Sequence, residues 1–231
     1  MKAMILAAGR GERLRPLTDR LPKPLIEVGG KPLIVWHLER LAAAGFGEVV
    51  INLSHLGERI EQSLGDGREW GVALAYSKEP EPLETAGGLA FARARLGEDP
   101  FLLVNGDVYC EHPLAALRAR QLDSALAHLV LVPNPAFRPG GDFSLHAERV
   151  GNGAAPRYTY AGVAVISPRL VDAVAPGTRA ALAPLLRAAA DAGRVSGELY
   201  EGIWTDVGTA GRRAALDARL RAAAAGTRMP Q

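Results

Sequence analysis

Residues 6–25 decide the fold: they read LAAGRGERLRPLTDRLPKPL and continue the apolar run KAMIL, residues 2–6. A continuous apolar run that ends just before Gly9 is typical of a buried strand. The segment 6–25 holds two glycines, three prolines, four arginines and one lysine. Glycines let backbone N–H groups approach an anion, and the basic side chains supply charge, so the segment is typical of a phosphate-binding loop.

Two widespread phosphate-binding loops do not match this segment. The dinucleotide-binding fingerprint needs a third glycine where this chain has Leu14, and Pro16 follows where its helix should begin. The P-loop needs Ser or Thr after Gly30-Lys31, where this chain has Pro32. The residues by themselves leave a phosphate-binding loop of another kind, or an ordinary basic surface loop.

Beyond this loop, short apolar runs alternate with helix-length segments as far as Val132. The pattern predicts strands at Lys2–Leu6, Val49–Leu53, Val72–Tyr76, Phe101–Val104 and Ala127–Val132, and helices at Pro32–Ala44, Leu56–Leu64, Gly87–Leu96 and Leu114–Gln121. This alternation predicts an α/β fold, a mostly parallel sheet with helices on both faces. Such sheets bind ligands at the carboxyl ends of their strands, where the glycine-containing loop lies.

The pattern changes after Val132, and the second half is expected to be a smaller lid on the same domain, residues 1–231. Its expected elements are a loop at Pro133–Gly141, strands at Asp142–Val150 and Arg157–Val165, a helix at Leu182–Ala192, a strand-rich stretch at Val195–Trp204 and a helix at Thr209–Ala225.

Composition excludes several classes of protein. The net charge of +2, from 27 basic and 25 acidic residues, argues against general nucleic-acid binding. The single cysteine, Cys110, excludes an internal disulfide and a cysteine-based zinc site. No stretch has transmembrane length, and the N-terminal apolar run is too short for a signal-peptide core, so we expect a cytoplasmic protein without a membrane partner.

Five motifs in order resemble those of the sugar-1-phosphate nucleotidyltransferases. They are LAAGRGERLRPLTDRLPKPLIEVGGKPLI (6–34), LETAGG (83–88), VNGD (104–107), YAGV (160–163) and WTDVGT (204–209). The resemblance covers nearly the whole chain and implies a Rossmann-like α/β domain, the nucleotide-diphospho-sugar transferase fold. It implies nucleotide binding by about residues 1–132, sugar-phosphate binding by about residues 133–208, and a C-terminal helix over 209–225.

Among the subfamilies, the short length and the details LETAGG, FLLVNGDVY, GDFSL, VSGELY and WTDVGT are most similar to N-acetylmuramic acid 1-phosphate uridylyltransferases of peptidoglycan recycling. The resemblance implies Mg²⁺-dependent transfer of UMP from UTP to that sugar 1-phosphate, with release of pyrophosphate. We expect a monomer or a small homo-oligomer.

The resemblance also implies roles for individual residues. Arg13 would hold the β- and γ-phosphates, because a guanidinium fork fits phosphate oxygens. Lys23 would stabilise charge at the α-phosphate, and Asp107 and Asp206 would share one Mg²⁺. Lys23, Arg13 and Asp107 form the implied catalytic set, and the implied nucleotide-binding residues are Leu6, Ala8, Gly9, Arg10, Gly11, Glu84, Thr85, Ala86, Gly88 and Asn105.

The acceptor side departs from the family. Many members carry Glu-Lys-Pro before the Tyr-Ala-Gly strand, whereas residues 148–157 read ERVGNGAAPR. We expect Gly162, Glu148 and Arg157 to bind the sugar phosphate, with Arg149 as the alternative to Arg157. Arg138 or a neighbour is expected to meet a carboxylate of the acceptor.

Two other functions stay open from the sequence. One keeps the chemistry but uses mannose or glucose 1-phosphate with GTP, dTTP or UTP. The other is a catalytically inactive sensor of sugar nucleotides, which would have lost Lys23, Arg13 or a metal-binding aspartate, and all of these are present.

Overall fold

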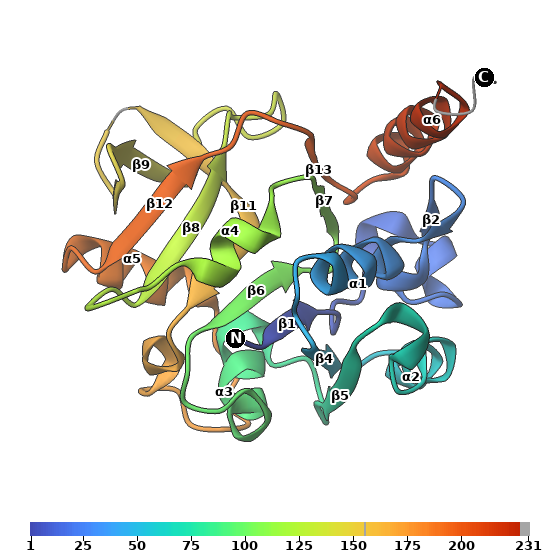
Figure 1. Ribbon diagram of the computed structural model, residues 1–231, viewed down its shortest axis with the longest axis horizontal. Coiled ribbons are helices and arrows are strands. Elements are labelled where there is room, and N and C mark those ends of the chain that lie inside the picture. The colour runs from blue at the N-terminus through green and yellow to red at the C-terminus, as the bar shows by residue number, and fades with distance from the viewer. Residues whose placement is uncertain (155, 227–231) are drawn as a thin grey trace.

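The computed structural model describes residues 1–154 and 156–226, so the end of the expected domain, residues 227–231, lies outside it (Figure 1). Its centre is a nine-stranded sheet of order β5-β4-β1-β6-β11-β8-β12-β10-β9. The strands are β1 (Ala3–Leu6), β4 (Glu48–Leu53), β5 (Ala73–Lys78), β6 (Phe101–Asn105), β8 (Ala127–Val132), β9 (Phe143–His146), β10 (Arg149–Gly151), β11 (Arg157–Ile166) and β12 (Val195–Leu199).

The sheet is mixed, but most of its strands run in one direction. β5, β4, β1 and β6 are parallel neighbours, as are β8 and β12. β11 runs antiparallel between β6 and β8, and β10 runs antiparallel to β12 and β9. Only β11 and β10 therefore oppose the other strands of this sheet, and the predicted α/β class is confirmed.

Helices cover both faces of the sheet, as the alternating pattern predicted. α1 (Leu33–Ala43), α2 (Gly57–Leu64) and α4 (Leu114–Ala119) pack on one face, and α3 (Glu84–Leu96) and α5 (Leu182–Asp191) pack on the other. Successive side chains of a strand point to opposite faces, so Ile5 joins the first core and Met4 the second. Both side chains are fully buried.

The C-terminal helix α6 (Ala210–Gly226) lies outside the main sheet, beside the hairpin of β2 (Glu27–Val28) and β3 (Lys31–Pro32) (Figure 1). Its Leu216 and Leu220 share a small third core with Val28 and Val207. This core fixes the short strand β13 (Trp204–Asp206), which pairs antiparallel with β7 (Val108–Cys110).

Several boundaries differ from the predicted ones. The strand predicted at Asp142–Val150 is two strands, β9 and β10, because the chain reverses at Ala147, which has a left-handed φ of 52°. α3 begins three residues before the predicted Gly87, at Glu84. β7 was not predicted, because its three residues are too few to show a period of two. Among the described helices, none is both long enough and apolar enough to span a membrane.

Candidate active site

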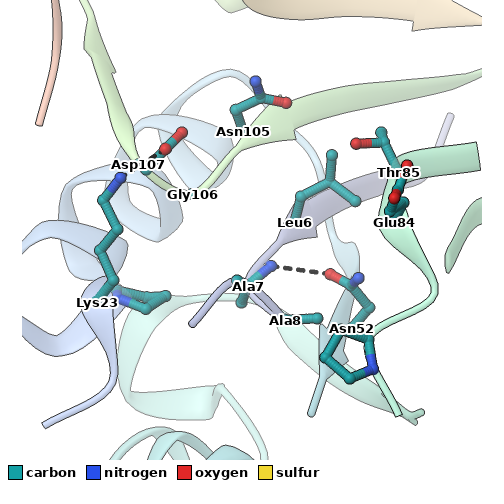
Figure 2. Close-up of a pocket in the computed structure, with 13 residues that line it drawn as sticks. Leu6, Ala7, Ala8, Lys23, Asn52, Glu84, Thr85, Asn105, Gly106 and Asp107 are labelled. Carbon is teal, nitrogen blue, oxygen red and sulfur yellow. Dashed lines mark hydrogen bonds and ion pairs between the residues drawn. The ribbon is translucent and has the colours of Figure 1, made fainter. Parts of the chain in front are cut away.

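The carboxyl ends of three neighbouring strands meet at one edge of the sheet. Leu6, the last residue of β1, pairs with Asn52 of β4 on one side and with Asn105 of β6 on the other. The glycine-containing loop after β1 and the turn after β6 are therefore side by side (Figure 2). Gly106 makes the approach possible, because its N–H donates to the Leu6 carbonyl at 2.9 Å and a Cβ there would lie 2.5 Å from the same oxygen.

Two cavities open at this edge and share part of their lining. The smaller, of about 330 Å³, is lined by Leu6, Ala7, Ala8, Gly9, Lys23, Pro24, Asn52, Pro82, Glu84, Thr85, Asn105, Gly106 and Asp107. The larger, of about 800 Å³, is lined by Ala8, Gly9, Arg10, Gly11, Glu12, Arg13, Leu14, Lys23, Glu81, Pro82, Asp107, Arg179 and Gly208. Lys23 and Asp107 line both cavities, and so lie where the two meet.

Lys23 is held by a short 3-10 turn, Lys23–Leu25, whose Pro24 and Leu25 are buried. Proline fixes φ on both sides of Lys23, so its backbone has little freedom. The Lys23 side chain is 9% exposed and its Nζ donates to Asp107 Oδ2 at 2.6 Å. Figure 2 shows the side chain rising along the cavity toward Asp107. The lysine is thus pre-positioned and neutralised by one carboxylate.

Gly11 folds the basic loop back on itself. It has a left-handed φ of 66°, and a Cβ there would lie 2.8 Å from Thr18 Cγ2. Thr18 Oγ1 donates to the Gly11 carbonyl at 2.9 Å, which closes the loop. The fold places Arg10 and Arg13 on the wall of the larger cavity, where they face Arg179 from the second half of the chain. Four cations and three carboxylates line this cavity, and the four cations, Arg10, Arg13, Lys23 and Arg179, suit a polyphosphate.

A buried polar network joins the start of the loop to the turn before α3. Ala7 N–H donates to Asn52 Oδ1 at 2.8 Å, and Asn52 Nδ2 donates to Glu79 Oε1 at 2.7 Å. Leu83 N–H donates to Glu79 Oε2 at 3.0 Å. Burial raises the pKa of Glu79, and the hydrogen bonds from Leu83 and Asn52 oppose that shift. The sequence analysis missed Asn52 and Glu79, although a polar residue inside the run VVINL was a visible signal.

The LETAGG turn separates into lining and packing residues. Glu84 and Thr85 line the smaller cavity, whereas Ala86 and Gly88 line neither. Gly88 instead lets α3 approach the buried network, because a Cβ there would lie 2.7 Å from Glu79 Oε1. Ala86 N–H donates to the Ala180 carbonyl at 2.9 Å. These two residues position the nucleotide-binding turn without facing the cavity.

The second half of the chain docks on this turn. Ala180 N–H donates to the Leu83 carbonyl at 3.0 Å, and a Cβ at Gly87 would lie 2.3 Å from the Thr178 carbonyl oxygen. Arg179 Nε donates to Glu84 Oε1 at 2.8 Å. Arg179, which the sequence analysis did not select, therefore reaches the larger cavity as part of this docked segment.

Asp206 is the last residue of β13, and Asp107 lies in the turn just before β7, the strand with which β13 pairs. Asp206 pairs with Val108 in the β13–β7 ladder, and Val207 N–H donates to the Asp107 carbonyl at 2.8 Å. Asp206 Oδ1 is buried without a hydrogen-bond partner, and Gly208 leaves it room, since a Cβ there would lie 2.5 Å away. Asp206 lines neither cavity, but a carboxylate oxygen without a partner, on a strand hydrogen-bonded to the turn that carries Asp107, fits a divalent cation.

The two aspartates are too few to complete a cation's coordination by themselves. Within residues 1–154 and 156–226, no group of three or more His, Cys, Asp or Glu side chains is arranged to hold a metal ion. Mg²⁺ prefers one or two carboxylates together with substrate phosphates and water. The pair therefore fits a cation that arrives with a phosphate ligand.

Gly162 leaves room for a side chain that lines the smaller cavity. It lies in a bulge of β11, between Tyr160 and Ala164, with a left-handed φ of 76°. A Cβ there would lie 2.7 Å from Asn105 Nδ2, so the glycine leaves the space in which the Asn105 side chain stands. Gly162 acts on the cavity through Asn105.

The other two residues predicted to bind the sugar phosphate lie outside both cavities. Arg157 donates to the carbonyls of Gly140, Asn152, Gly153 and Asp142. Glu148 pairs with Arg120, and neither Glu148 nor Arg157 lines either cavity.

The remaining two candidate arginines are also placed elsewhere. Arg138 is paired with Asp142, and Arg149 lies against Gly193. Arg138 is therefore paired with a carboxylate, and neither arginine lines the cavities.

Two other titratable side chains near the site are packing groups. The Cys110 thiol is buried and its pKa is raised to about 11 by burial, so it carries no thiolate for nucleophilic catalysis. His37 lies beneath Asp107 on α1, and burial, with the nearby Arg40 charge, lowers its pKa to about 4. It is neutral at physiological pH.

Comparison with known proteins agrees with this geometry. Residues 2–136 match the family described as nucleotidyl transferase. The chain is 52% identical over 222 residues to N-acetylmuramate alpha-1-phosphate uridylyltransferase of Neisseria meningitidis serogroup B, covering 90% of this chain and 94% of that protein. It is 35% identical over 233 residues to the protein of the same name from Caulobacter vibrioides, covering 94% and 96%.

Other relatives match less of the chain or share only the fold. The mannose-1-phosphate guanyltransferase of Schizosaccharomyces pombe is 48% identical over 122 residues, which are 52% of this chain and 34% of that protein. A putative glucose-1-phosphate thymidylyltransferase from Bacillus anthracis has a TM-score of 0.84 at 21% identity, covering 96% of this chain and 95% of that chain. The family match spans more than half of the chain and two relatives match nearly all of it, so this enzyme belongs to the nucleotidyl transferase family, as its five motifs predicted.

Proposed function

We propose that the enzyme transfers UMP from UTP to N-acetylmuramic acid 1-phosphate, forming UDP-N-acetylmuramic acid and pyrophosphate, as in peptidoglycan recycling. The observation that carries the reaction class is the Lys23–Asp107 pair where the two cavities meet. The choice of base and sugar is supported by two relatives of that name, which match 90% and 94% of the chain. The mannose-1-phosphate guanyltransferase matches only 52%.

The reaction joins two anions, so the protein must first neutralise charge. A phosphate oxygen of the sugar attacks the α-phosphorus of UTP, a new P–O bond forms, and the bond from the α-phosphorus to the bridging oxygen of pyrophosphate breaks. Little covalent chemistry is asked of the protein, and positioning with electrostatic stabilisation carries the step. Lys23 is the cation nearest the junction of the cavities.

Lys23 and Asp107 are each other's counterion before substrates bind. A divalent cation, Mg²⁺ in our proposal, held by Asp107 and Asp206 would supply charge neutralisation at the phosphates. Lys23 then contacts the α-phosphate. Its positive charge stabilises the transition state most, because negative charge moves toward the leaving group there.

The two cavities divide the nucleotide between them in this proposal. The smaller holds the base, the ribose and the acceptor, against Leu6, Thr85 and Asn105. The larger holds the β- and γ-phosphates, with Arg13 as the main contact and Arg10 and Arg179 adding charge. Pyrophosphate leaves from this basic cavity.

The decisive test is pyrophosphate release by the purified protein with Mg²⁺. UTP, GTP, dTTP and ATP are each paired with the 1-phosphates of N-acetylmuramic acid, N-acetylglucosamine, glucose and mannose. We expect the highest kcat/KM for UTP with N-acetylmuramic acid 1-phosphate. Preference for another pair would reject the proposed substrates and keep the chemistry. Release with no pair would favour the sugar-nucleotide sensor.

The proposed substrates also suggest the setting of the reaction. A nucleoside triphosphate is consumed, so we place the enzyme in the cytoplasm, as a monomer or small homo-oligomer acting without nucleic acid or membrane.

A further inference from the structure

Arg212 lies in the first turn of α6, just after the WTDVGT motif, and contacts Asp206, the aspartate of that motif. Its Nε donates to the Asp206 carbonyl at 2.9 Å, and its Nη2 lies 3.4 Å from Asp206 Oδ2. Its own backbone N–H donates to Thr209 Oγ1 at 3.3 Å. The guanidinium is thus bound to both the backbone and the side chain of Asp206, which restricts the carboxylate to one orientation.

The same guanidinium also stacks on an aromatic side chain of the loop Pro133–Gly141. Phe137, in the loop Pro133–Gly141, lies under Arg212 with 4.1 Å between the guanidinium carbon and the ring centroid. Phe137 is 49% exposed, so the stack with Arg212 lies at the surface. Asn134 ties the two ends of the loop, donating to the carbonyls of Pro139 and Arg157. The stacked pair therefore joins an organised loop to the strand that carries Asp206.

Arg212 lies behind Gly208, which lines the larger cavity. A Cβ at Gly208 would lie 2.4 Å from Arg212 Nη2, 2.5 Å from Asp206 Oδ1 and 3.0 Å from Arg13 Nη2. Two guanidinium groups and a carboxylate therefore converge on one glycine. Gly208 itself lines the larger cavity. Arg212 stands between the phosphate contacts and the acceptor-side loop.

We propose that Arg212 is a positioning residue that orients Asp206 for a divalent cation and, through its stack with Phe137, links the cation site to the 133–141 loop. The proposal rests on the reaction class of the proposed function but on neither its base nor its sugar. Because binding linkage is reciprocal, ordering the loop around an acceptor strengthens cation binding, and cation binding favours the ordered loop.

Simple electrostatics makes the opposite prediction. Arg212 is a positive charge beside the cation site, so its removal by charge alone would tighten cation binding. If Arg212 acts by orienting Asp206, its removal weakens cation binding, as loss of an outer-shell contact does at other metal sites, typically by 10- to 100-fold. The sign of the change in cation affinity therefore separates the two roles.

The experiment titrates Mn²⁺ into the full chain, alone and with UTP, and follows free Mn²⁺ by electron paramagnetic resonance. We expect Arg212→Ala to weaken Mn²⁺ binding roughly tenfold. Arg219→Ala is the matched control, since it removes the same charge from an exposed position of the same helix. Arg212→Lys keeps the charge but loses the guanidinium fork, and is also expected to bind Mn²⁺ more weakly. Unchanged or tighter binding in both Arg212 variants would overturn the proposal.

The link to the loop is tested by a double-mutant cycle on the same titration. Phe137→Ala is expected to weaken Mn²⁺ binding in the wild-type background, and Phe137→Tyr to restore it, because tyrosine keeps the aromatic face. In the Arg212→Ala background, Phe137→Ala is expected to have no further effect, because the ring acts through Arg212. Additive effects of the two substitutions would overturn the link.

Mn²⁺ binding and pyrophosphate release together distinguish an error in the role of Arg212 from an error in the proposed substrates. A wild-type chain that binds Mn²⁺ in neither titration would reject a positioning role, since there would be no cation site to position. A chain that shows the expected Mn²⁺ pattern but releases pyrophosphate with another substrate pair would support the role of Arg212 and reject the proposed base or sugar.

Discussion

Lys23 Nζ lies 2.6 Å from Asp107 Oδ2, where the loop after β1 meets the turn after β6. The lysine side chain is 9% exposed and the aspartate 39%, so water and ligands reach the pair from the aspartate side. A buried ammonium needs a partner, and a divalent cation at Asp107 would displace it toward another anion. The pair is therefore arranged to exchange partners when a phosphate and a cation enter together.

Lys23→Ala is expected to lower kcat by about 10²- to 10³-fold and to change the KM for UTP only a few-fold. The physical reason is that the lysine charge stabilises the transition state more than bound UTP. Steady-state kinetics with saturating acceptor measure both constants. Equal losses in kcat and in UTP affinity would contradict the assigned role.

Asp107→Ala and Asp206→Ala are each expected to abolish cation-dependent turnover while the chain still folds, with a lower melting temperature for Asp107→Ala because Lys23 loses its carboxylate partner. Each removes one of the two carboxylates that fit the cation, and neither side chain belongs to the hydrophobic cores. Pyrophosphate release across a Mg²⁺ titration, with a thermal melt of each variant, checks both statements. Asp99→Ala, at an exposed loop position, is the control. Turnover at the wild-type rate in either variant would remove that aspartate from the site.

Gly162→Ala and Gly177→Ala form a matched pair. Both glycines have left-handed φ values, 76° and 86°, so both substitutions carry a similar backbone penalty of about 1 kcal/mol. Only the Cβ at Gly162 meets another side chain, Asn105 Nδ2 at 2.7 Å. We expect only Gly162→Ala to raise the acceptor KM, measured alongside stability in urea. The same acceptor KM in both variants would show that Asn105 is not displaced.

Asn52→Ala is expected to destabilise the protein by about 1–3 kcal/mol and to raise the KM for UTP. It leaves the buried Ala7 N–H and Glu79 carboxyl without their shared partner. Asn152→Ala removes two hydrogen bonds donated by Nδ2 and a longer one accepted from Arg187, but at a half-exposed site, and is expected to have little effect. Urea denaturation and UTP kinetics compare the two variants. Equally small changes in stability and in the KM for UTP in both variants would contradict a structural role of the Asn52 network.

His37 is expected to make stability depend on pH below neutrality. Its folded pKa is lowered from 6.5 to about 4, chiefly by burial, so the folded state favours the neutral ring. The unfolded chain binds the proton first, and stability present above pH 6.5 is lost as the pH falls toward 4, by about 3 kcal/mol in all.

His37→Leu removes the contribution of His37 to this pH dependence. The contributions of His112 and His128, whose pKa values are also lowered by burial, remain in the variant. Urea unfolding at several pH values between 7 and 4 should give a shallower loss for the variant than for the wild type. Parallel curves would show that His37 is not the group that titrates.

Much of the site was predictable because its chemistry is local in the sequence. Gly11, Lys23 and Asp107 stand in short motifs at strand ends, and each keeps there the backbone that its motif implies. Glu148 and Arg157 were selected from a segment in which a family motif is absent, and their sugar-phosphate role stays a prediction. In the structure they line neither cavity, and Arg157 donates to four backbone carbonyls, which the sequence does not show to lack partners.

The sequence by itself determined the α/β class and the glycine-containing basic loop after the first strand, because hydrophobic period and glycine placement are local properties. Only the tertiary structure decided which distant side chains meet. Asp206 reaches Asp107 through a three-residue ladder, Asn52 reaches Ala7 across a strand pair, and Arg212 reaches Phe137 across two loops. Such contacts depend on strand register and helix docking, which are set by burial of the whole core and not by any one segment.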